Sequence, residues 1–100
     1  MKAEIEFVGM PASDAVTDHV NKKVGKLADR YSWITNVAVF LKEENRTDGK
    51  NMKSEIRLSV PGPQIFAESV ETDMYGSINE TIRDLEVQLE KHKSVMYNKA

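Results

Sequence analysis

The stretch that decides the fold runs from residue 14 to residue 42 and reads "DAVTDHVNKKVGKLADRYSWITNVAVFLK". Its first half repeats apolar residues every three or four positions, which is the spacing of one face of a helix. The members of this stripe are Val16, Val20, Val24, Leu27 and Tyr31. Its second half alternates apolar and polar residues from Val37 to Leu41, which is the period of a half-buried strand. The stretch therefore predicts a helix followed by a strand, and Ser13 is placed to cap the helix.

The same alternation extends outward on both sides of this stretch. Residues 2–8 predict a first strand before the helix. A polar segment with an Asp-Gly turn follows the second strand, and residues 55–60 alternate again as a third strand. The "PGP" sequence at residues 61–63 ends that strand, and residues 64–71 predict a fourth.

A second helix is predicted from residue 73 to residue 97, with its own apolar stripe. The stripe consists of Met74, Ile78, Ile82, Leu85, Leu89 and Met96. Because the strands alternate, one face of the sheet is polar, and both helices should cover the other face. The sequence therefore predicts an α+β fold, a two-layer β-α-β-β-β-α sandwich with a four-stranded mixed sheet, in which residues 1–100 form a single domain.

The composition excludes several kinds of site. The chain has 100 residues and no cysteine, so it has no disulfide, no thiol nucleophile and no zinc–thiolate site. The N-terminal "MKAEIEFVG" lacks the continuous apolar core of a signal peptide, and no apolar run approaches the about 20 residues that cross a bilayer. We expect a cytoplasmic protein that binds no membrane, metal, cofactor or small-molecule substrate.

The predicted first helix separates its charges, although the whole chain has a formal net charge of only −2. On a helical wheel of about 100° per residue, Asp14, Asp18 and Asp29 lie on one flank and the basic side chains share another. The basic sector contains His19, Lys22, Lys23, Lys26 and Arg30. This separation leaves two interpretations: a solvated helix face, or a surface that binds the phosphates of a nucleic acid.

Positive charge returns at the end of the second helix. The residues are Lys91, His92, Lys93 and Lys99. The helix dipole favours cations in the last turns of a helix and explains part of this cluster. An antiparallel or crossed packing of the two helices would bring it close to the basic flank of the first helix.

The residues of catalytic type do not form a cluster in the sequence. His19 and His92 lie on different helices, and His92 falls on the buried side of its helix, where a packed histidine is expected. Four glutamates are predicted to lie as solvated residues on the open face of the sheet: Glu4, Glu6, Glu55 and Glu68. Such a face lacks the cleft that tunes an acid–base pair. We therefore expect no enzymatic activity.

The aromatic residues and one glycine are given structural roles. Phe40 and Phe66 have the strand parity of the open face. Trp33 is expected to close the edge of the core, and Tyr75 to anchor the start of the second helix. Gly25 weakens the first helix by about 1 kcal/mol relative to alanine, and we expect it to permit close packing on the sheet.

The opening stretch, together with "TDMYGSINETIRDLEVQLEKHK" at residues 72–93, resembles the short ribosome hibernation promoting factor family, also called ribosome-associated inhibitor or YfiA-type proteins. The most specific parts are "DMY" at 73–75, the run at 88–93 and "KKVGKL" at 22–27. The resemblance implies a domain like those that bind double-stranded RNA. It also implies binding to the small ribosomal subunit, between head and body, where the protein blocks the path of tRNA and mRNA in stressed or stationary-phase cells.

The resemblance also implies contacts between basic residues and ribosomal RNA. Carried over by position, these residues are Lys23, Lys26, Lys42, Lys91, His92 and Lys93, and the one-sided charge of the first helix adds Lys22 and Arg30. Asp84 and Val87 occupy positions in the second helix that are commonly basic in the family, and Val87 is predicted to be exposed. The chain is expected to lack the C-terminal domain by which long-form relatives join two ribosomes. The alternative is a regulatory module of the sigma-factor-modulation type that binds a protein and no RNA.

Overall fold

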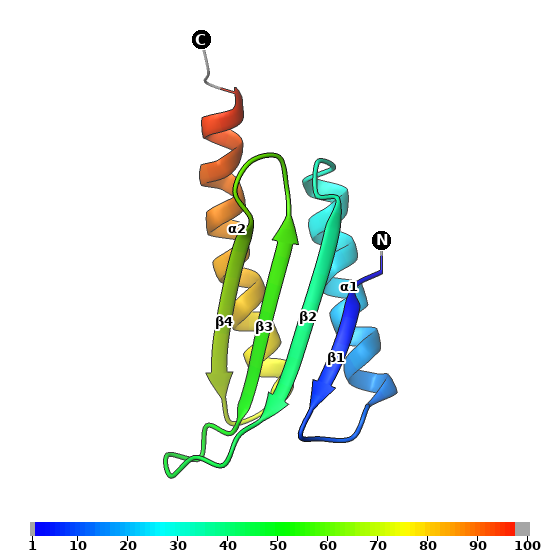
Figure 1. The fold of residues 1–100 in the computed structure, drawn as a ribbon, viewed down its shortest axis with the longest axis vertical. Helices are drawn as coiled ribbons and strands as arrows, with labels where there is room; N and C mark the ends of the chain where they lie inside the picture. Colours follow the sequence, from blue (N-terminus) through cyan, green and yellow to red (C-terminus); the bar gives the residue numbers. More distant parts are fainter. Residues whose placement is uncertain (1, 98–100) are drawn as a thin grey trace.

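The computed structural model describes residues 2–97, and its elements follow the predicted order (Figure 1). They are β1 (Glu4–Val8), α1 (Asp14–Arg30), β2 (Asn36–Glu43), β3 (Met52–Ser59), β4 (Ile65–Glu71) and α2 (Met74–Tyr97). The strands form one sheet in the order β1-β2-β3-β4, with β1 parallel to β2 and the other neighbours antiparallel. The predicted mixed sheet is confirmed. Lys99, predicted at the basic end of the second helix, lies outside the described residues.

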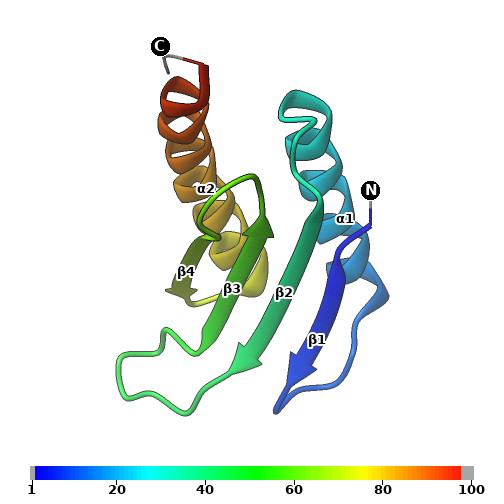
Figure 2. The same cartoon turned by 45° about the horizontal axis from the view of Figure 1, so that its top comes forward.

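Both helices lie on the same face of the sheet, and the other face is open (Figures 1 and 2). The predicted stripes form the core, apart from Met96, which is only partly buried because the end of α2 extends beyond the sheet (Figure 1). Val20 and Val24 of α1, with Ile78 of α2, have no exposed surface. They pack against the inward residues of the strands in one continuous cluster. Neither helix, over the part of the chain that the structure describes, is long and apolar enough to cross a membrane.

The two helices run in the same direction, and residues further along α1 contact residues further along α2. The side-chain contacts that show this include His19 with Asn79, Arg30 with Glu86 and Tyr31 with Glu90, at sequence separations of 60, 56 and 59 residues. The strand directions explain this arrangement. Strands β1 and β4 point the same way, and each is followed by a helix that folds back over the sheet. The antiparallel packing considered above is therefore not the one formed, and the shared direction itself places the end of α2 on the side where α1 ends.

Helix α1 begins as predicted, but its glycine has a different role from the one expected. The backbone of Ser13 is extended, and its Oγ accepts a hydrogen bond from the backbone N–H of Val16 at 3.3 Å. A Cβ atom built on Gly25 would meet no other atom within 4 Å. The expectation that Gly25 permits close packing on the sheet is therefore wrong, because this position faces open space.

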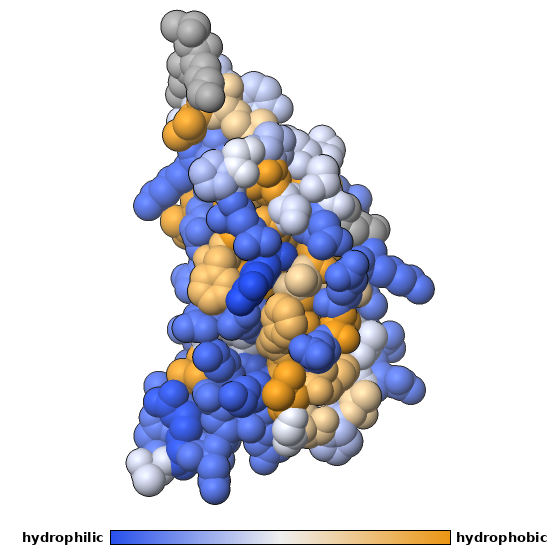
Figure 3. Space-filling view, viewed as in Figure 1, coloured by the Kyte–Doolittle hydropathy of each residue, from blue (hydrophilic) through white to orange (hydrophobic). Residues whose placement is uncertain are grey.

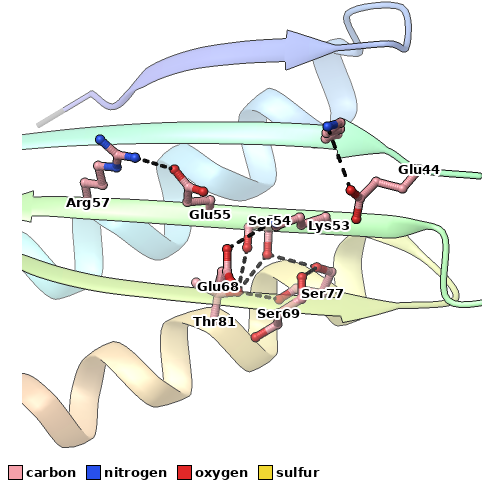
Figure 4. Close-up of polar contacts among 10 residues, drawn as sticks. Glu44, Lys53, Ser54, Glu55, Arg57, Glu68, Ser69, Ser77 and Thr81 are labelled. Atoms are coloured by element: carbon pink, nitrogen blue, oxygen red, sulfur yellow. Dashed lines mark hydrogen bonds and ion pairs between the residues drawn. The ribbon is translucent and has the colours of Figure 1, made fainter.

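Helix α2 is fixed to the sheet by a seam of buried hydroxyl groups (Figure 4). The Oγ of Ser54 in β3 lies 2.9 Å from the Oγ of Ser77 and 2.7 Å from the Oγ1 of Thr81. The hydroxyl of Ser77 also donates to the backbone carbonyl of Ser69 in β4. All three hydroxyls are fully buried, and no buried side-chain polar atom of the described residues lacks a partner. The seam therefore sets both the height and the rotation of α2 on the sheet.

Candidate RNA-binding surface

A groove lies between α1 and α2, and three of the predicted site residues line it. The groove has a volume of about 230 Å³, and we call it the inter-helix groove; its lining residues are Lys23, Lys26, Leu27, Arg30, Ile82 and Glu86. Its apolar floor consists of Leu27 and Ile82, which also belong to the core. The three cations are spaced by three and four residues along α1, so they project from one side of the helix.

The cations of the inter-helix groove differ in how they are paired. The Nη1 of Arg30 lies 3.4 Å from the Oε2 of Glu86, and its Nη2 lies 3.6 Å from the Oε2 of Glu90. Neither Lys23 nor Lys26 takes part in any ion pair found within residues 2–97. Exposed ion pairs contribute only about 0–1 kcal/mol, so Arg30 is held loosely. The two lysines carry the available positive charge of the groove.

Tyr31 and Glu90 organise the end of the groove. The buried Tyr31 donates its hydroxyl hydrogen to the Oε2 of Glu90. Burial raises the pKa of Tyr31 to about 12, and the hydrogen bond to Glu90 adds to this shift. The hydrogen bond from Tyr31 lowers the pKa of Glu90, and the charges of Lys93 and Arg30 lower it further. Lys93 therefore lies on the same flank of α2 as the groove.

Lys91 and His92 lie on the opposite flank of α2. They line a second hollow of about 330 Å³ beside β4, together with apolar residues that include Ile65 and Val95. The Nε2 of His92 lies 2.7 Å from the carbonyl oxygen of Pro61, and its ring centroid lies 5.4 Å from that of Trp33. The interpretation of His92 as a packed residue is confirmed, as is the position of Trp33 at the edge of the core.

Lys22 and Lys42 complete the predicted set and lie outside both hollows. Lys22 is exposed on α1, one turn before Lys26. Lys42 is exposed near the end of β2, where its Nζ lies 3.8 Å from the Oε2 of Glu44. The structure thus brings Lys23, Lys26, Arg30 and Lys93 to one flank and distributes the remaining four over other surfaces.

The open face of the sheet has the aromatic residues that strand parity predicts. The guanidinium carbon of Arg57 lies 5.6 Å from the ring centroid of Phe40 and 5.7 Å from that of Phe66. Figure 3 shows this face, with hydrophilic side chains over the β2–β3 connection and more apolar side chains across β1 and β2. Arg57 also pairs with Glu55 at 3.1 Å (Figure 4). The side chains of this face are therefore held in place by cation–π contacts and an ion pair with one another.

The carboxylates of the open face are solvated or paired, as expected. Glu55 and Glu68 are neighbours across β3 and β4. The Oε2 of Glu68 forms an ion pair with the Nζ of Lys53 at 3.3 Å (Figure 4). Among residues 2–97, no three histidine, aspartate or glutamate side chains are placed to hold a metal ion together.

Two further predictions concern the start and the middle of α2. The ring of Tyr75 meets that of His19 edge-on, at a centroid distance of 5.0 Å. Tyr75 therefore anchors the first turn of α2 to α1, as expected. The side chain of Val87 is 56% exposed and confirms the prediction for this residue.

Sequence reasoning missed Glu86 and Glu90 as parts of the site. Their spacing of four residues places both on one flank of α2, and this is visible in the sequence. Their pairing with Arg30 depends on the direction in which the helices pack. The periodicity of either helix alone contains no signal for that direction.

The comparison with known families decides the affiliation of the chain. The sequence model of the sigma 54 modulation protein / S30EA ribosomal protein family matches residues 3–96. The chain belongs to this family. The S30EA match covers every strand and almost all of α2, so it includes both sides of the inter-helix groove.

Individual S30EA relatives are similar over nearly the whole chain. The ribosome hibernation promoting factor of Pseudomonas putida is 30% identical over 93 residues, which cover 93% of this chain and 87% of that protein. The factor of the same name from Escherichia coli is 33% identical and covers 93% and 94%. Among solved structures, the N-terminal domain of Protein Y from Thermus thermophilus is 28% identical, with a TM-score of 0.73 and coverage of 92% and 99%.

Proposed function

We propose that this protein is a cytoplasmic ribosome hibernation factor. In this proposal it binds the RNA of the small ribosomal subunit and blocks the path of mRNA and tRNA under stress or in stationary phase. Family membership and the names of the relatives support a role at the ribosome. The observation that supports RNA binding is the pair Lys23 and Lys26, which line an accessible groove and are not engaged in the ion pairs of the described chain. Occupation of a path requires no reaction and therefore no catalytic residue.

Whether a cation is already paired with a carboxylate of the protein determines how much we expect it to contribute to RNA binding. Lys23 and Lys26 gain RNA phosphates without losing an internal partner. Arg30 must exchange two carboxylates for a phosphate, so it contributes less. Lys93 extends the same flank on α2, and Lys22 is exposed elsewhere on α1, one turn before Lys26. Lys42, Lys91 and His92 lie on other faces and contribute where the subunit surrounds the domain.

A regulatory module that binds another protein is the second candidate. The observation that favours it is the exposure of large apolar side chains, including Phe66 at 41% and Val87 at 56%. An interface built on such residues depends weakly on salt, whereas binding to phosphates weakens steeply as the salt concentration rises. Salt dependence therefore separates the two candidates.

Charge reversal of the two free lysines tests the proposed function. The double variant Lys23→Glu/Lys26→Glu should no longer sediment with purified small ribosomal subunits. The matched control is Lys2→Glu/Lys50→Glu, which makes the same charge change at exposed positions outside the groove and should sediment like the wild type. Thermal melts followed by circular dichroism would show that both variants fold. Equal sedimentation of the two double variants would overturn the proposal for these lysines.

A further inference from the structure

The inter-helix groove contains one group that phosphate binding does not explain. Glu86 lines the groove together with Lys23, Lys26 and Arg30, and its side chain is 39% exposed. A carboxylate at this position repels phosphate and reduces the positive field of the three cations. Its ion pair with Arg30 at 3.4 Å connects the two helices but engages only Oε2. Its place beside an apolar floor points to a ligand with both apolar and hydrogen-bond-donating parts.

The shape of the groove fits a single nucleotide base. Its volume of about 230 Å³ is below the roughly 300–1,000 Å³ of pockets for drug-sized ligands. Leu27 and Ile82 provide an apolar floor for the ring. Lys23 and Lys26 also line the groove, so their positive charges are available to the phosphates next to a bound base. Proteins that recognise RNA sequence commonly stack unstacked bases on aromatic side chains or on the guanidinium plane of Arg and read their Watson–Crick edges; Arg30 is the group of this groove that can stack in that way.

The chemistry of Glu86 selects among the bases. A carboxylate only accepts hydrogen bonds. Guanine has two adjacent donors on its Watson–Crick edge, N1–H and the N2 amino group, and can donate to both carboxylate oxygens. Adenine, cytosine and uracil each place an acceptor next to their donor, and this acceptor would face the second carboxylate oxygen. We propose that the inter-helix groove binds one unstacked guanine of the ribosomal RNA, with Glu86 accepting from N1–H and N2–H. This inference rests on the proposed function.

Arg30 can release Glu86 to a bound guanine and still keep other partners. Its contact with Glu86 is long, at 3.4 Å, and engages only Oε2. When Glu86 turns to a base, Arg30 retains Glu90 at 3.6 Å and the ring of Tyr31, whose centroid lies 5.2 Å from its guanidinium carbon. The guanidinium therefore stays at the edge of the groove, where its planar face can stack on the base.

Binding of short labelled RNAs tests the inference. The probes are the pentanucleotides UUGUU and UUAUU, measured by fluorescence anisotropy with the full chain. The wild type should bind UUGUU about ten-fold more tightly, which corresponds to one bidentate contact. Glu86→Gln should bind both probes equally, because the amide presents a donor where guanine needs a second acceptor. The matched control Asp84→Asn removes one negative charge from an exposed position of the same helix outside the groove, and it should keep the guanine preference.

The outcomes separate this inference from the proposed function. Equal binding of the two probes by the wild type, or a guanine preference that persists in Glu86→Gln, would overturn the guanine site. In either case, sedimentation of the wild type with small subunits, lost in Lys23→Glu/Lys26→Glu, would leave the proposed function standing. If the wild type bound neither probe and did not sediment with subunits, both would fail.

Discussion

At the scale of single residues, Tyr31 connects the core to the charged surface. Its ring is almost completely buried, and its hydroxyl reaches the partly exposed carboxylate of Glu90. Glu90 in turn holds Arg30 and lies near Lys93. A core residue thus positions the carboxylate that lies between two cations near the inter-helix groove.

The variant Tyr31→Phe should change how the free energy of unfolding depends on pH, because it removes the hydrogen bond to Glu90. The pKa of Glu90 is lowered in the folded state, so its contact stabilises the fold above the ordinary value of 4.5 and is lost as the pH falls through the lowered value. The pKa of Tyr31 is raised from 10.0 to about 12, so the contribution of its neutral form is lost as the pH rises through that range.

We therefore expect Tyr31→Phe to lower the free energy of unfolding by about 1 kcal/mol at neutral pH. Urea titrations of both proteins across the pH range would measure the difference. The gap should narrow at both the acidic and the alkaline extreme. A gap of constant size at every pH would mean that the hydroxyl contributes by packing and not through Glu90.

The residue scale also shows where reading the sequence succeeds. Strand parity correctly assigned Phe40 and Phe66 to the open face, because parity depends only on the local backbone. The partners of Arg30 could not be predicted in this way, because Glu86 and Glu90 are more than 50 residues away in the chain. Pairing across elements depends on packing that a single helix does not encode.

At the scale of elements, the direction of the helices follows from the order of the strands. Because β1, β2 and β4 point the same way, two helices that follow β1 and β4 must both run back in the opposite direction. The antiparallel arrangement stayed open as long as the helices were considered without the strands, whose directions exclude it. The hydroxyl seam escaped prediction for a related reason: Ser77 and Thr81 are polar residues of a helix, and only their packing on the sheet shows that they are buried.

Helix α1 offers a test at this scale, because its glycine has no packing partner. Gly25→Ala should raise the free energy of unfolding by about 1 kcal/mol, which corresponds to roughly 4–8 °C in Tm for a domain of this size. The matched variant Ala28→Gly, in the same helix, should lower it by a similar amount. Both would be measured by thermal unfolding. A destabilising Gly25→Ala would show that the position needs close packing after all.

At the scale of the whole molecule, positive charge is local and the net charge is slightly negative. The chain has a formal net charge of −2, yet one flank carries Lys23, Lys26, Arg30 and Lys93. The hydrophobic periodicity predicted the two-layer arrangement correctly, because the apolar stripes of both helices can be buried only against the apolar face of the sheet. The eight predicted cations could not be divided among the surfaces in advance, because Lys91 and Lys93 are only two residues apart and lie on opposite flanks of α2.

Salt dependence measures this local charge directly. The logarithm of the affinity for small subunits should fall linearly with the logarithm of the salt concentration, by about 0.7 to 0.9 per phosphate neutralised. Lys23→Gln should reduce this slope by about one such unit, while Lys2→Gln should leave it unchanged. Binding measured at four or more salt concentrations would give both slopes. A slope near zero for the wild type would favour the protein-binding module.

The shared direction of α1 and α2 also gives the molecule an electrical polarity. The carbonyl ends of both helices point toward the same end of the sandwich, so their partial negative charges add and do not cancel. Arg30 lies in the last turn of α1 and offsets the negative pole there, whereas the last turn of α2 contains no basic residue and Lys91 and Lys93 stand before that turn. The effect of a helix end is confined to its last turn, so the two poles act only on groups that reach this end of the sandwich. Replacing Arg30 by a neutral residue would leave both poles uncompensated.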